Sequence, residues 1–588
     1  MKMVGATLVG LVLWTIVMFV FSIIGFAGIM ASEGMTDVED GSILRITLNG
    51  EVTERDESSP LAILGGDNET LALEQLLEAI DKAGKSDKVK GIYLEGGALA
   101  ASPAMLQELR QALVKFKETN KWIVAYGDTY TQGSYYICSV ADELYINPQG
   151  MLDWHGMAAQ PMFYTEVMKK LGVKMQVFKV GTFKSAVEPF INTEMSEPNR
   201  QQVTSYLTSI WGNMVSEVAK SRKLTPEKLN AMADTLLVFQ STDYLLKEKM
   251  VDKAKYKDEI RDLLKKKCDL DEDETLTFVS VNEMANSEVS LEKKDDCIAV
   301  LYAYGDIVDD AANNMTRGMA GTIAPAPINK ELDKLMNDDD VKAVVIRVNS
   351  GGGSAYASEQ IWRHVTLLKK KKPVVVSMGG MAASGGYYIS CNASKIVAEP
   401  TTLTGSIGIF GMIPDMSELL TEKIGLRYDV VKTNAHSDFG AQDRPFTPEE
   451  GRLVQAHIER GYDLFTRRVA EGRNISQDSV KVIAEGRVWT GEQAKKIGLV
   501  DELGNLETAI KAAAKLAKTK DYVIAKYPES SSFFEKLMSE NNDEGFMESQ
   551  LKSTLGEYYG TFNTIRNMKN LKGQGMIQAR MPYELIIR

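Results

Sequence analysis

Cysteine and histidine are scarce in this chain of 588 residues, which has four of each. The histidines are scattered, and no cysteine pair has the short spacing of a zinc or redox motif. The sequence therefore predicts no metal site. Cys138 and Cys391 lie in apolar segments and are expected in the core. Cys268 and Cys297 flank the middle of the chain, and the sequence leaves undecided whether they form a disulfide.

Basic residues are outnumbered, with 68 Lys and Arg against 80 Asp and Glu, which gives a net charge of −12. No long basic run or basic-aromatic stripe interrupts this balance. A protein that binds nucleic acid needs concentrated positive charge to neutralise phosphates. The composition therefore argues against a nucleic-acid partner.

Charge is absent from Met3 to Ser32, and the run Val4–Met30 is mostly apolar. A bilayer core needs roughly 20 such residues, more than the 7–15 of a secretory signal. We therefore expect a membrane anchor over residues 1–32, with a cleaved signal peptide as the alternative. Lys2 before the segment favours an N-terminus inside the cytoplasm and the bulk of the chain outside it.

The rest of the chain is a diverged tandem repeat with a spacing near 252 residues. Residues 43–52 match 298–307, residues 89–97 match 341–349, and residues 121–127 match 373–379. Such a spacing is too long for a solenoid and is typical of a duplicated domain. The predicted domains are residues 40–265 and 290–525, followed by a helical extension with a terminal strand over residues 526–588.

Each half alternates short β-branched runs with amphipathic segments, such as Leu71–Ala83 and Ser358–Lys370. This alternation predicts a largely parallel sheet with crossover helices, hence an α/β fold in each domain.

The stretch Ser377–Ser390 places a serine between a buried strand and an apolar helix. Ser384 is flanked there only by alanine and glycine. The first turn of a helix has free backbone N–H groups, so this position suits a nucleophile beside an oxyanion site. Gly385 could supply one N–H donor and the glycine-rich loop Asn349–Ser354 the other. The structural alternative is a small-residue turn that lets a helix pack closely on a sheet.

The two repeats have lost complementary residues. Gln132 stands where the second half has Ser384, and Ser437 stands where the first half has Lys184. One composite site shared by both domains would produce this pattern, with Lys184 as general base. Burial would lower the pKa of Lys184 toward neutrality, whereas a contact with Glu188 would raise it.

Two alternatives to this pair remain open. Lys184 could be an ordinary surface lysine. Ser384 could instead belong to a triad with His436 and Asp438, which lie beside the repeat counterpart of Lys184.

Four segments together resemble the long form of the bacterial signal peptide peptidase A family, also called protease IV. They are Val180–Phe190, Met381–Ser390, Arg347–Gly353 and Thr404–Gly408. The resemblance covers roughly residues 40–525 and the N-terminal anchor. The glycine loop departs from the family pattern, because Asn-Ser-Gly-Gly-Gly stands in place of Asn-Ser-Pro-Gly-Gly.

The resemblance implies a Ser384 nucleophile, a Lys184 base, and an oxyanion hole from Gly385 and Gly352. It implies domains like those of the caseinolytic protease and crotonase superfamily, in a homotetramer with interior sites. The expected substrates are signal peptides left in the bacterial inner membrane, and no metal or other cofactor is required. The other hypotheses are a non-catalytic scaffold that binds extended apolar peptides and a crotonase-like thioester chemistry.

Overall fold

A computed structural model describes residues 37–55, 70–287, 296–309, 321–529 and 577–580 of the protein. The expected anchor over residues 1–32 and most of the predicted C-terminal extension lie outside these ranges. Within them, no helix combines the length and the apolar character that a membrane crossing requires.

The first half of the chain forms a seven-stranded parallel sheet in the order β2-β1-β3-β4-β5-β7, with β8 beside β1. Its strands are β1 (Ser42–Thr53), β2 (Thr70–Ala72), β3 (Val89–Ala100), β4 (Trp122–Tyr130), β5 (Glu143–Leu152), β7 (Lys253–Ala254) and β8 (Phe278–Val279). Its main helices are α3 (Leu73–Lys85), α4 (Pro103–Lys117), α5 (Gln132–Cys138), α8 (Glu197–Arg222), α9 (Pro226–Ala233), α10 (Thr242–Lys247), α11 (Lys257–Lys267) and α12 (Val281–Ala285).

The second half forms an eight-stranded sheet with the path β18-β16-β14-β12-β9-β20, and β15 joins β14 to β19. Its strands are β9 (Asp296–Tyr304), β12 (Val341–Ser350), β14 (Val374–Ala383), β15 (Lys395–Ala398), β16 (Leu403–Gly405), β18 (Val488–Thr490), β19 (Glu502–Leu503) and β20 (Tyr522–Tyr527). Its helices are α13 (Pro325–Asn337), α14 (Ala355–Lys369), α15 (Gly385–Ser390), α16 (Pro448–Arg473), α17 (Gln477–Ile483), α18 (Gly491–Lys496) and α19 (Leu506–Ala517).

The neighbouring strands β1, β3, β4 and β5 of the first sheet correspond to β9, β12, β14 and β15 of the second. In both halves the third of these strands runs directly into a short buried helix, α5 or α15. Each half also has a 26-residue helix, α8 or α16, that begins at a Ser or Thr cap followed by proline in the first turn. The tandem α/β architecture expected from the sequence is thus confirmed, while the exact domain limits remain predictions.

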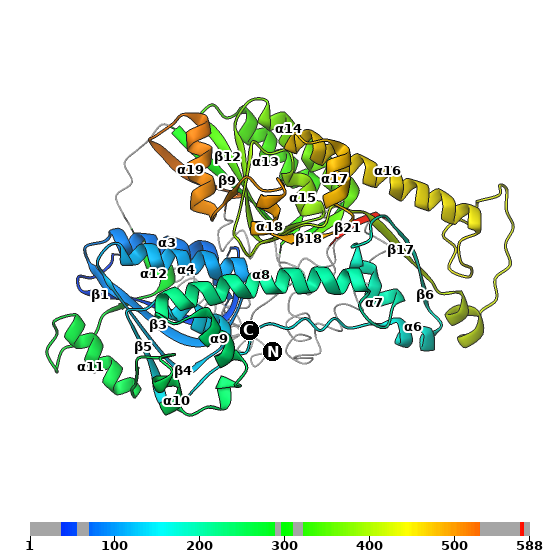
Figure 1. Ribbon diagram of the computed structural model, residues 1–588. Helices are drawn as coiled ribbons and strands as arrows, with labels where there is room; N and C mark the ends of the chain where they lie inside the picture. Colours follow the sequence, from blue (N-terminus) through cyan, green and yellow to red (C-terminus); the bar gives the residue numbers. More distant parts are fainter. Residues whose placement is uncertain (1–36, 56–69, 288–295, 310–320, 530–576, 581–588) are drawn as a thin grey trace, which may run out of the picture.

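A third sheet draws strands from both halves, in the order β11-β10-β13-β21-β17-β6. Its strands are β6 (Lys174–Lys179), β10 (Asp306–Ile307), β11 (Thr322–Ile323), β13 (Gly352–Ser354), β17 (Phe410–Asp415) and β21 (Ile577–Arg580). Figure 1 shows the two large sheets one above the other, α8 along their junction, and β6 and β17 reaching out together to one side. The third sheet therefore connects the two halves, because it pairs β6 of the first half with β17 of the second.

A buried ionic cluster also joins the halves. Arg347 of β12 donates to Glu54 at 3.0 Å and to Glu108 of α4 at 2.6 Å, and all three side chains are at most 3% exposed. Asn349 donates to the second oxygen of Glu54 at 2.9 Å and accepts from the Met381 N–H at 3.0 Å. The cluster thus connects the end of β1 to the strand that precedes Ser384.

The four cysteines are free and buried, so Cys268 and Cys297 do not form the disulfide that the sequence left open. Cys138 and Cys391 are in the core, as expected from their apolar surroundings. Packing and interdomain polar contacts therefore hold the described part of the chain together without covalent cross-links.

Arg347→Ala should lower the free energy of unfolding by about 3–5 kcal/mol, because it leaves two buried carboxylates without their cation. Urea unfolding followed by circular dichroism measures the change. Arg467→Ala is the control, since Arg467 pairs with Asp463 on the surface at 2.7 Å and should change stability by at most about 0.5 kcal/mol. Equal effects of the two substitutions would contradict the assigned role of the cluster.

Candidate functional site

Ser384 connects β14 to α15 in an uncommon backbone conformation, with φ 54° and ψ −113°. Its N–H donates to the Gly405 carbonyl at 2.8 Å, and its carbonyl accepts from Tyr388 at 2.8 Å. The following glycines let the helix start come close to its neighbours. A Cβ on Gly385 would lie 2.7 Å from Ser358 Oγ, and one on Gly386 would lie 2.6 Å from the Ser350 carbonyl oxygen.

Lys184 reaches Ser384 from the other half of the chain. It follows β6 and immediately precedes the short helical turn Ser185–Val187. Its Nζ lies 2.8 Å from Ser384 Oγ, 3.1 Å from Ser406 Oγ and 3.2 Å from the Ser406 carbonyl oxygen. The structure therefore brings together the two residues that complementary loss in the repeats had linked.

The amine of Lys184 is withdrawn from water, since the residue is 1% exposed. Burial lowers its pKa to about 7, because the charged form loses its hydration. Glu188 does not oppose this shift, because its carboxylate accepts from Ser196 and Asn199 instead. A substantial fraction of Lys184 is therefore neutral near pH 7 and able to accept a proton.

Glycines make room for the lysine side chain. A Cβ on Gly486 would lie 2.7 Å from Lys184 Cβ, and one on Gly408 would lie 3.3 Å from Lys184 Cδ. The ring of Phe410 lies 5.9 Å from Nζ. The Phe183 N–H donates to the Glu485 carbonyl at 2.9 Å, which anchors the segment that carries the lysine.

The two glycines predicted for the oxyanion hole lie side by side. The Cα of Gly352 is 3.1 Å from the position that a Cβ on Gly385 would take. The Gly385 N–H belongs to the first turn of α15, where backbone N–H groups have no partner within the helix. The Gly352 N–H already donates to Ser350 Oγ at 3.1 Å, so Gly385 is the better placed donor.

Ser406 is the residue of this site that sequence reasoning missed. It offers two oxygens to Lys184 Nζ, and Gly408 places its carbonyl oxygen 3.5 Å from Ser384 Oγ. The repeat could have identified it, because the position in the first half that matches Ser406 is the buried Trp154, which has no hydroxyl. A hydroxyl present in only one copy marks Ser406 in the same way as Ser384.

The alternative triad is not assembled. His436 Nδ1 lies 3.5 Å from Glu450, and Asp438 pairs with Arg444 at 2.8 Å. Among the described residues, Ser384 Oγ accepts a hydrogen bond from Lys184 Nζ and donates one to the backbone carbonyl of Gly408. Gln132, the counterpart of Ser384, uses its amide to bind the backbone of His155 and Gly156.

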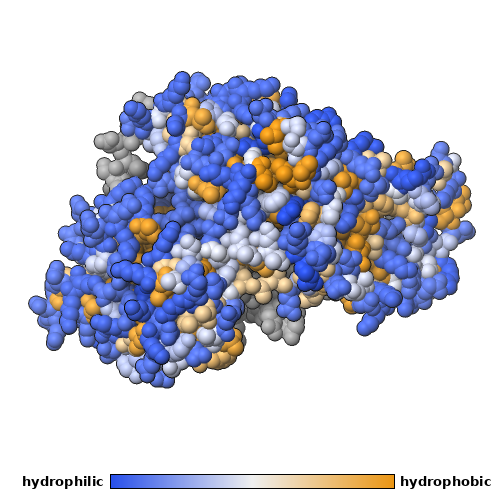
Figure 2. All heavy atoms as spheres, viewed as in Figure 1, coloured by the Kyte–Doolittle hydropathy of each residue, from blue (hydrophilic) through white to orange (hydrophobic). Residues whose placement is uncertain are grey.

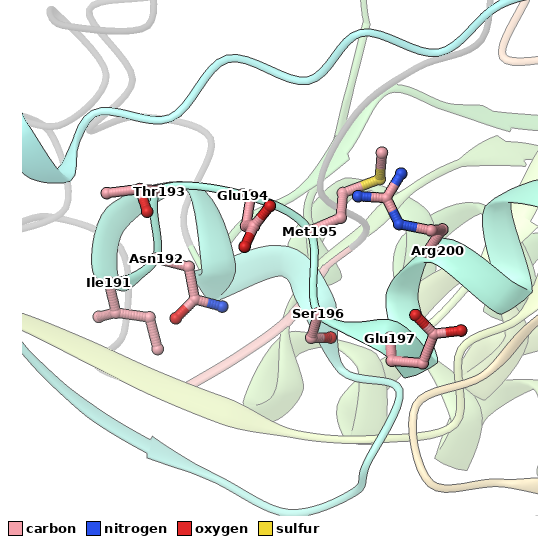
Figure 3. Close-up of a pocket in the computed structure, with 8 residues that line it drawn as sticks. All are labelled: Ile191, Asn192, Thr193, Glu194, Met195, Ser196, Glu197 and Arg200. Atoms are coloured by element: carbon pink, nitrogen blue, oxygen red, sulfur yellow. The ribbon is translucent and has the colours of Figure 1, made fainter.

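Two surface hollows lie along the segments that flank Lys184. One of about 470 Å³ is lined by Lys179, Val180, Gly181, Thr182, Tyr462, Lys481 and Glu485. Another of about 650 Å³ lies along the turn from Ile191 to Arg200, between α7 (Glu188–Ile191) and α8 (Figure 3). Neither is lined by the dyad. Within the described ranges, no group of acidic, histidine or cysteine side chains is arranged to hold a metal ion.

A serine hydroxyl at a helix start, in contact with a buried lysine of lowered pKa, is an arrangement suited to nucleophilic catalysis. Comparison with known families agrees with this class. The chain belongs to peptidase family S49, whose model matches residues 115–271 and 366–520, one segment in each half. The protein is therefore a serine peptidase with two copies of the family domain.

Relatives align over most of the chain. Protease 4 of Salmonella typhi is 36% identical over 79% of this chain and 75% of its own length. Protease 4 of Haemophilus influenzae is 34% identical over 85% of this chain and 83% of its own length. The chloroplastic serine protease SPPA of Arabidopsis thaliana is 30% identical over 82% of this chain and 70% of its own length. A solved ClpP1 mutant from Listeria monocytogenes covers 36% of this chain and 94% of its own, with 16% identity and a TM-score of 0.24. That similarity is too low to carry an argument.

Peptide hydrolysis should rise with pH through about 7, because Lys184 can accept a proton only in its neutral form. The kcat/KM of a fluorogenic peptide, measured from pH 5 to pH 9, should increase with a midpoint near the pKa of Lys184. Lys174→Ala should keep this profile, since the Lys174 side chain is 67% exposed on β6. A midpoint near the ordinary lysine value would show that burial does not activate Lys184.

Ser384→Gly should be more stable than Ser384→Ala by about 1 kcal/mol, because only glycine adopts a positive φ with negative ψ without strain. Urea unfolding of the two variants tests this. The matched control is Ser390, buried in α15, where Ala should be the more stable replacement by a similar amount. The same order at both positions would show that the Ser384 backbone is not strained.

Proposed function

We propose that the protein is an endopeptidase that works through a Ser384–Lys184 dyad. The observation that carries this proposal is the 2.8 Å contact between Lys184 Nζ and Ser384 Oγ inside a site that excludes water from the amine. A Ser/Lys pair needs a lysine that is neutral at working pH, and burial without a carboxylate partner supplies one.

Acylation begins with neutral Lys184 taking the proton of Ser384 Oγ. The oxygen attacks the carbonyl carbon of the peptide bond, and the negative charge that develops on the carbonyl oxygen meets the Gly385 N–H, with Gly352 as the proposed second donor. Collapse of the tetrahedral intermediate breaks the C–N bond. Lys184 gives its proton to the leaving amine, which leaves an ester on Ser384 and a neutral lysine.

Deacylation repeats these proton transfers with water. Lys184 takes a proton from a water molecule, which attacks the ester, and then returns the proton to Ser384 Oγ. Ser406 contributes positioning, because its hydroxyl and carbonyl oxygens fix the direction of the lysine amine. Apart from the peptide and one water molecule, every step uses groups of the chain itself.

Ser384→Ala and Lys184→Ala should each lower kcat/KM for peptide hydrolysis by at least about 10³-fold. The first substitution removes the nucleophile and the second removes its base. Rates are measured with a fluorogenic peptide, and circular dichroism checks that both variants fold.

The matched controls are Ser437→Ala and Lys174→Ala, which change an exposed serine and an exposed lysine and should leave hydrolysis unchanged. Hydrolysis that survives in either dyad variant would overturn the mechanism. A folded wild-type protein that binds peptides without cleaving them would favour the scaffold hypothesis instead.

The proposed substrates are remnant signal peptides, which are apolar and end near small residues. The resemblance to the signal peptide peptidase A family and the apolar segment Val4–Met30 support this assignment, because an anchored enzyme would meet such peptides at the membrane. We place the protein in the bacterial inner membrane with its bulk on the extracytoplasmic side. Faster cleavage of a synthetic signal peptide than of the same peptide with a polar core would support the assignment.

We also propose that the chain forms a homotetramer and that both of its domains have the fold of the caseinolytic protease and crotonase superfamily. The segment between β17 and α16 exposes several apolar side chains: Ile424, Leu426, Tyr428, Val430, Val431 and Phe439. We call the projecting segment between β17 and α16 the arm. Figure 2 shows hydrophobic residues among hydrophilic ones at the far end of this arm and over the region of β17. Apolar groups gathered on an arm that projects from the body support contact with another subunit.

A further inference from the structure

Glu399 is a buried carboxyl group at the junction of the two halves. It follows β15 and begins the turn Glu399–Thr402, which leads into β16. The residue is 1% exposed, although acidic side chains are almost never fully buried without a paired cation. Within the described ranges, Glu399 forms no ion pair. Its Oε2 accepts from the Gln111 amide at 2.8 Å, and its buried Oε1 has no hydrogen-bond partner there.

The surroundings of Glu399 oppose a negative charge. The charged or titratable groups on the elements around it are Glu108 and Arg110 of α4, Tyr136 of α5, Glu217 of α8, Arg347 of β12 and Glu492 of α18. Arg347 already pairs with Glu108 at 2.6 Å. Arg110 likewise lies 3.6 Å from Glu217. Burial, together with the charge of Glu108, raises the pKa of Glu399 to about 8, so at pH 7 the group is mostly a neutral carboxylic acid.

The turn that begins at Glu399 leads directly to the dyad. The three-residue strand β16 follows it, and the Gly405 carbonyl at the end of that strand accepts the Ser384 N–H at 2.8 Å. The next residue, Ser406, accepts from Lys184 Nζ through two oxygens. A shift of the turn would therefore be transmitted through β16 to the groups that hold both members of the dyad.

The first half of the chain holds this turn through two amides of α4. Gln111 donates to Glu399 Oε2, and Gln107 accepts from Thr401 Oγ1 at 2.8 Å. Figure 1 shows α4 on the side of the first sheet that faces the second half. Loss of the Glu399 proton would place an uncompensated charge beside Glu108. Such a buried charge is unfavourable unless the turn and α4 move apart and admit water.

We propose that Glu399 is a positioning residue for the Ser384–Lys184 dyad and that it works as a neutral carboxylic acid. In this form it keeps the turn against α4 and, through β16, fixes the positions of the Gly405 carbonyl and Ser406. Ionisation of Glu399 loosens the junction and misaligns the dyad. The inference rests on the proposed function, since it concerns the same pair of residues.

The pH profile of hydrolysis should therefore have a second limb. Its rise through about pH 7 comes from Lys184, which must be neutral to accept a proton. A fall above about pH 8 comes from Glu399, which must stay protonated to hold the turn. In the wild type, kcat for a fluorogenic peptide should pass through a maximum between these values.

Glu399→Gln tests this assignment, because its amide has the shape of the carboxylic acid and carries no charge at any pH. Its kcat should match the wild type near pH 7. At pH 9 the wild type should have lost about tenfold, since that is one unit above the pKa of Glu399, whereas the variant should keep its rate. Glu118→Gln, at the exposed end of α4, is the matched control and should fall like the wild type. A fall that persists in Glu399→Gln would overturn the inference.

Urea unfolding gives a readout that does not depend on hydrolysis. The unfolded chain ionises Glu399 near its ordinary pKa of 4.5, whereas the folded chain keeps the proton up to about pH 8. Between these values the group therefore lowers the stability of the wild type as pH rises. The urea midpoint of Glu399→Gln should exceed that of the wild type by a margin that grows from about pH 5 to about pH 8 and then levels off. A margin independent of pH would show that Glu399 is not held neutral and would overturn the inference.

Glu399→Ala separates positioning from a purely structural role. It should lower kcat at pH 7 at least about tenfold with little change in KM, because the turn loses its contact with Gln111 while the nucleophile and base remain. Circular dichroism measures the folded fraction, to which kcat is referred. An unchanged kcat per folded molecule would overturn the positioning role.

The dyad variants distinguish this inference from the proposed function. Hydrolysis that is lost in Ser384→Ala and Lys184→Ala but shows no alkaline fall dependent on residue 399 would overturn the inference and leave the proposed function standing. Hydrolysis that survives in Ser384→Ala or Lys184→Ala would overturn the proposed function itself.

Discussion

Burial of the Lys184 amine is the constraint on which the site depends. A buried lysine without a carboxylate partner loses hydration that no opposite charge replaces, so the neutral form is favoured and the pKa falls to about 7. Two oxygens of Ser406 and the hydroxyl of Ser384 accept hydrogen bonds from the amine. Because these groups are uncharged, they do not favour the protonated amine as a carboxylate would. Because Glu188 is held by Ser196 and Asn199, the only nearby acid in sequence does not cancel this effect.

The dyad can form only if the two halves of the chain keep a fixed relation. The lysine comes from the segment after β6 and the serine from the end of β14, so any sliding between the halves would separate them. Two features oppose such sliding. The third sheet pairs β6 directly with β17, and Arg347 holds Glu54 and Glu108 across the junction. Separating these buried charges would leave two carboxylates without their cation, which is strongly unfavourable.

Backbone rather than side chains dominates the rest of the site. The Gly352 segment and the Gly385 N–H at the start of α15 both present main-chain groups. Main-chain recognition suits a peptidase that must accept many sequences in extended form, because every peptide carries the same donors and acceptors.

The sequence by itself determined the tandem α/β architecture, because repeated strand and helix patterns persist after side chains diverge. It also singled out Ser384 and Lys184, since each hydroxyl or amine stands in one repeat and is replaced in the other. Only the tertiary structure decided that Nζ and Oγ lie 2.8 Å apart, that Glu188 turns away, and that Ser406 completes the lysine's surroundings. These outcomes depend on how two distant segments pack and on which groups lose contact with water, and local sequence patterns encode neither.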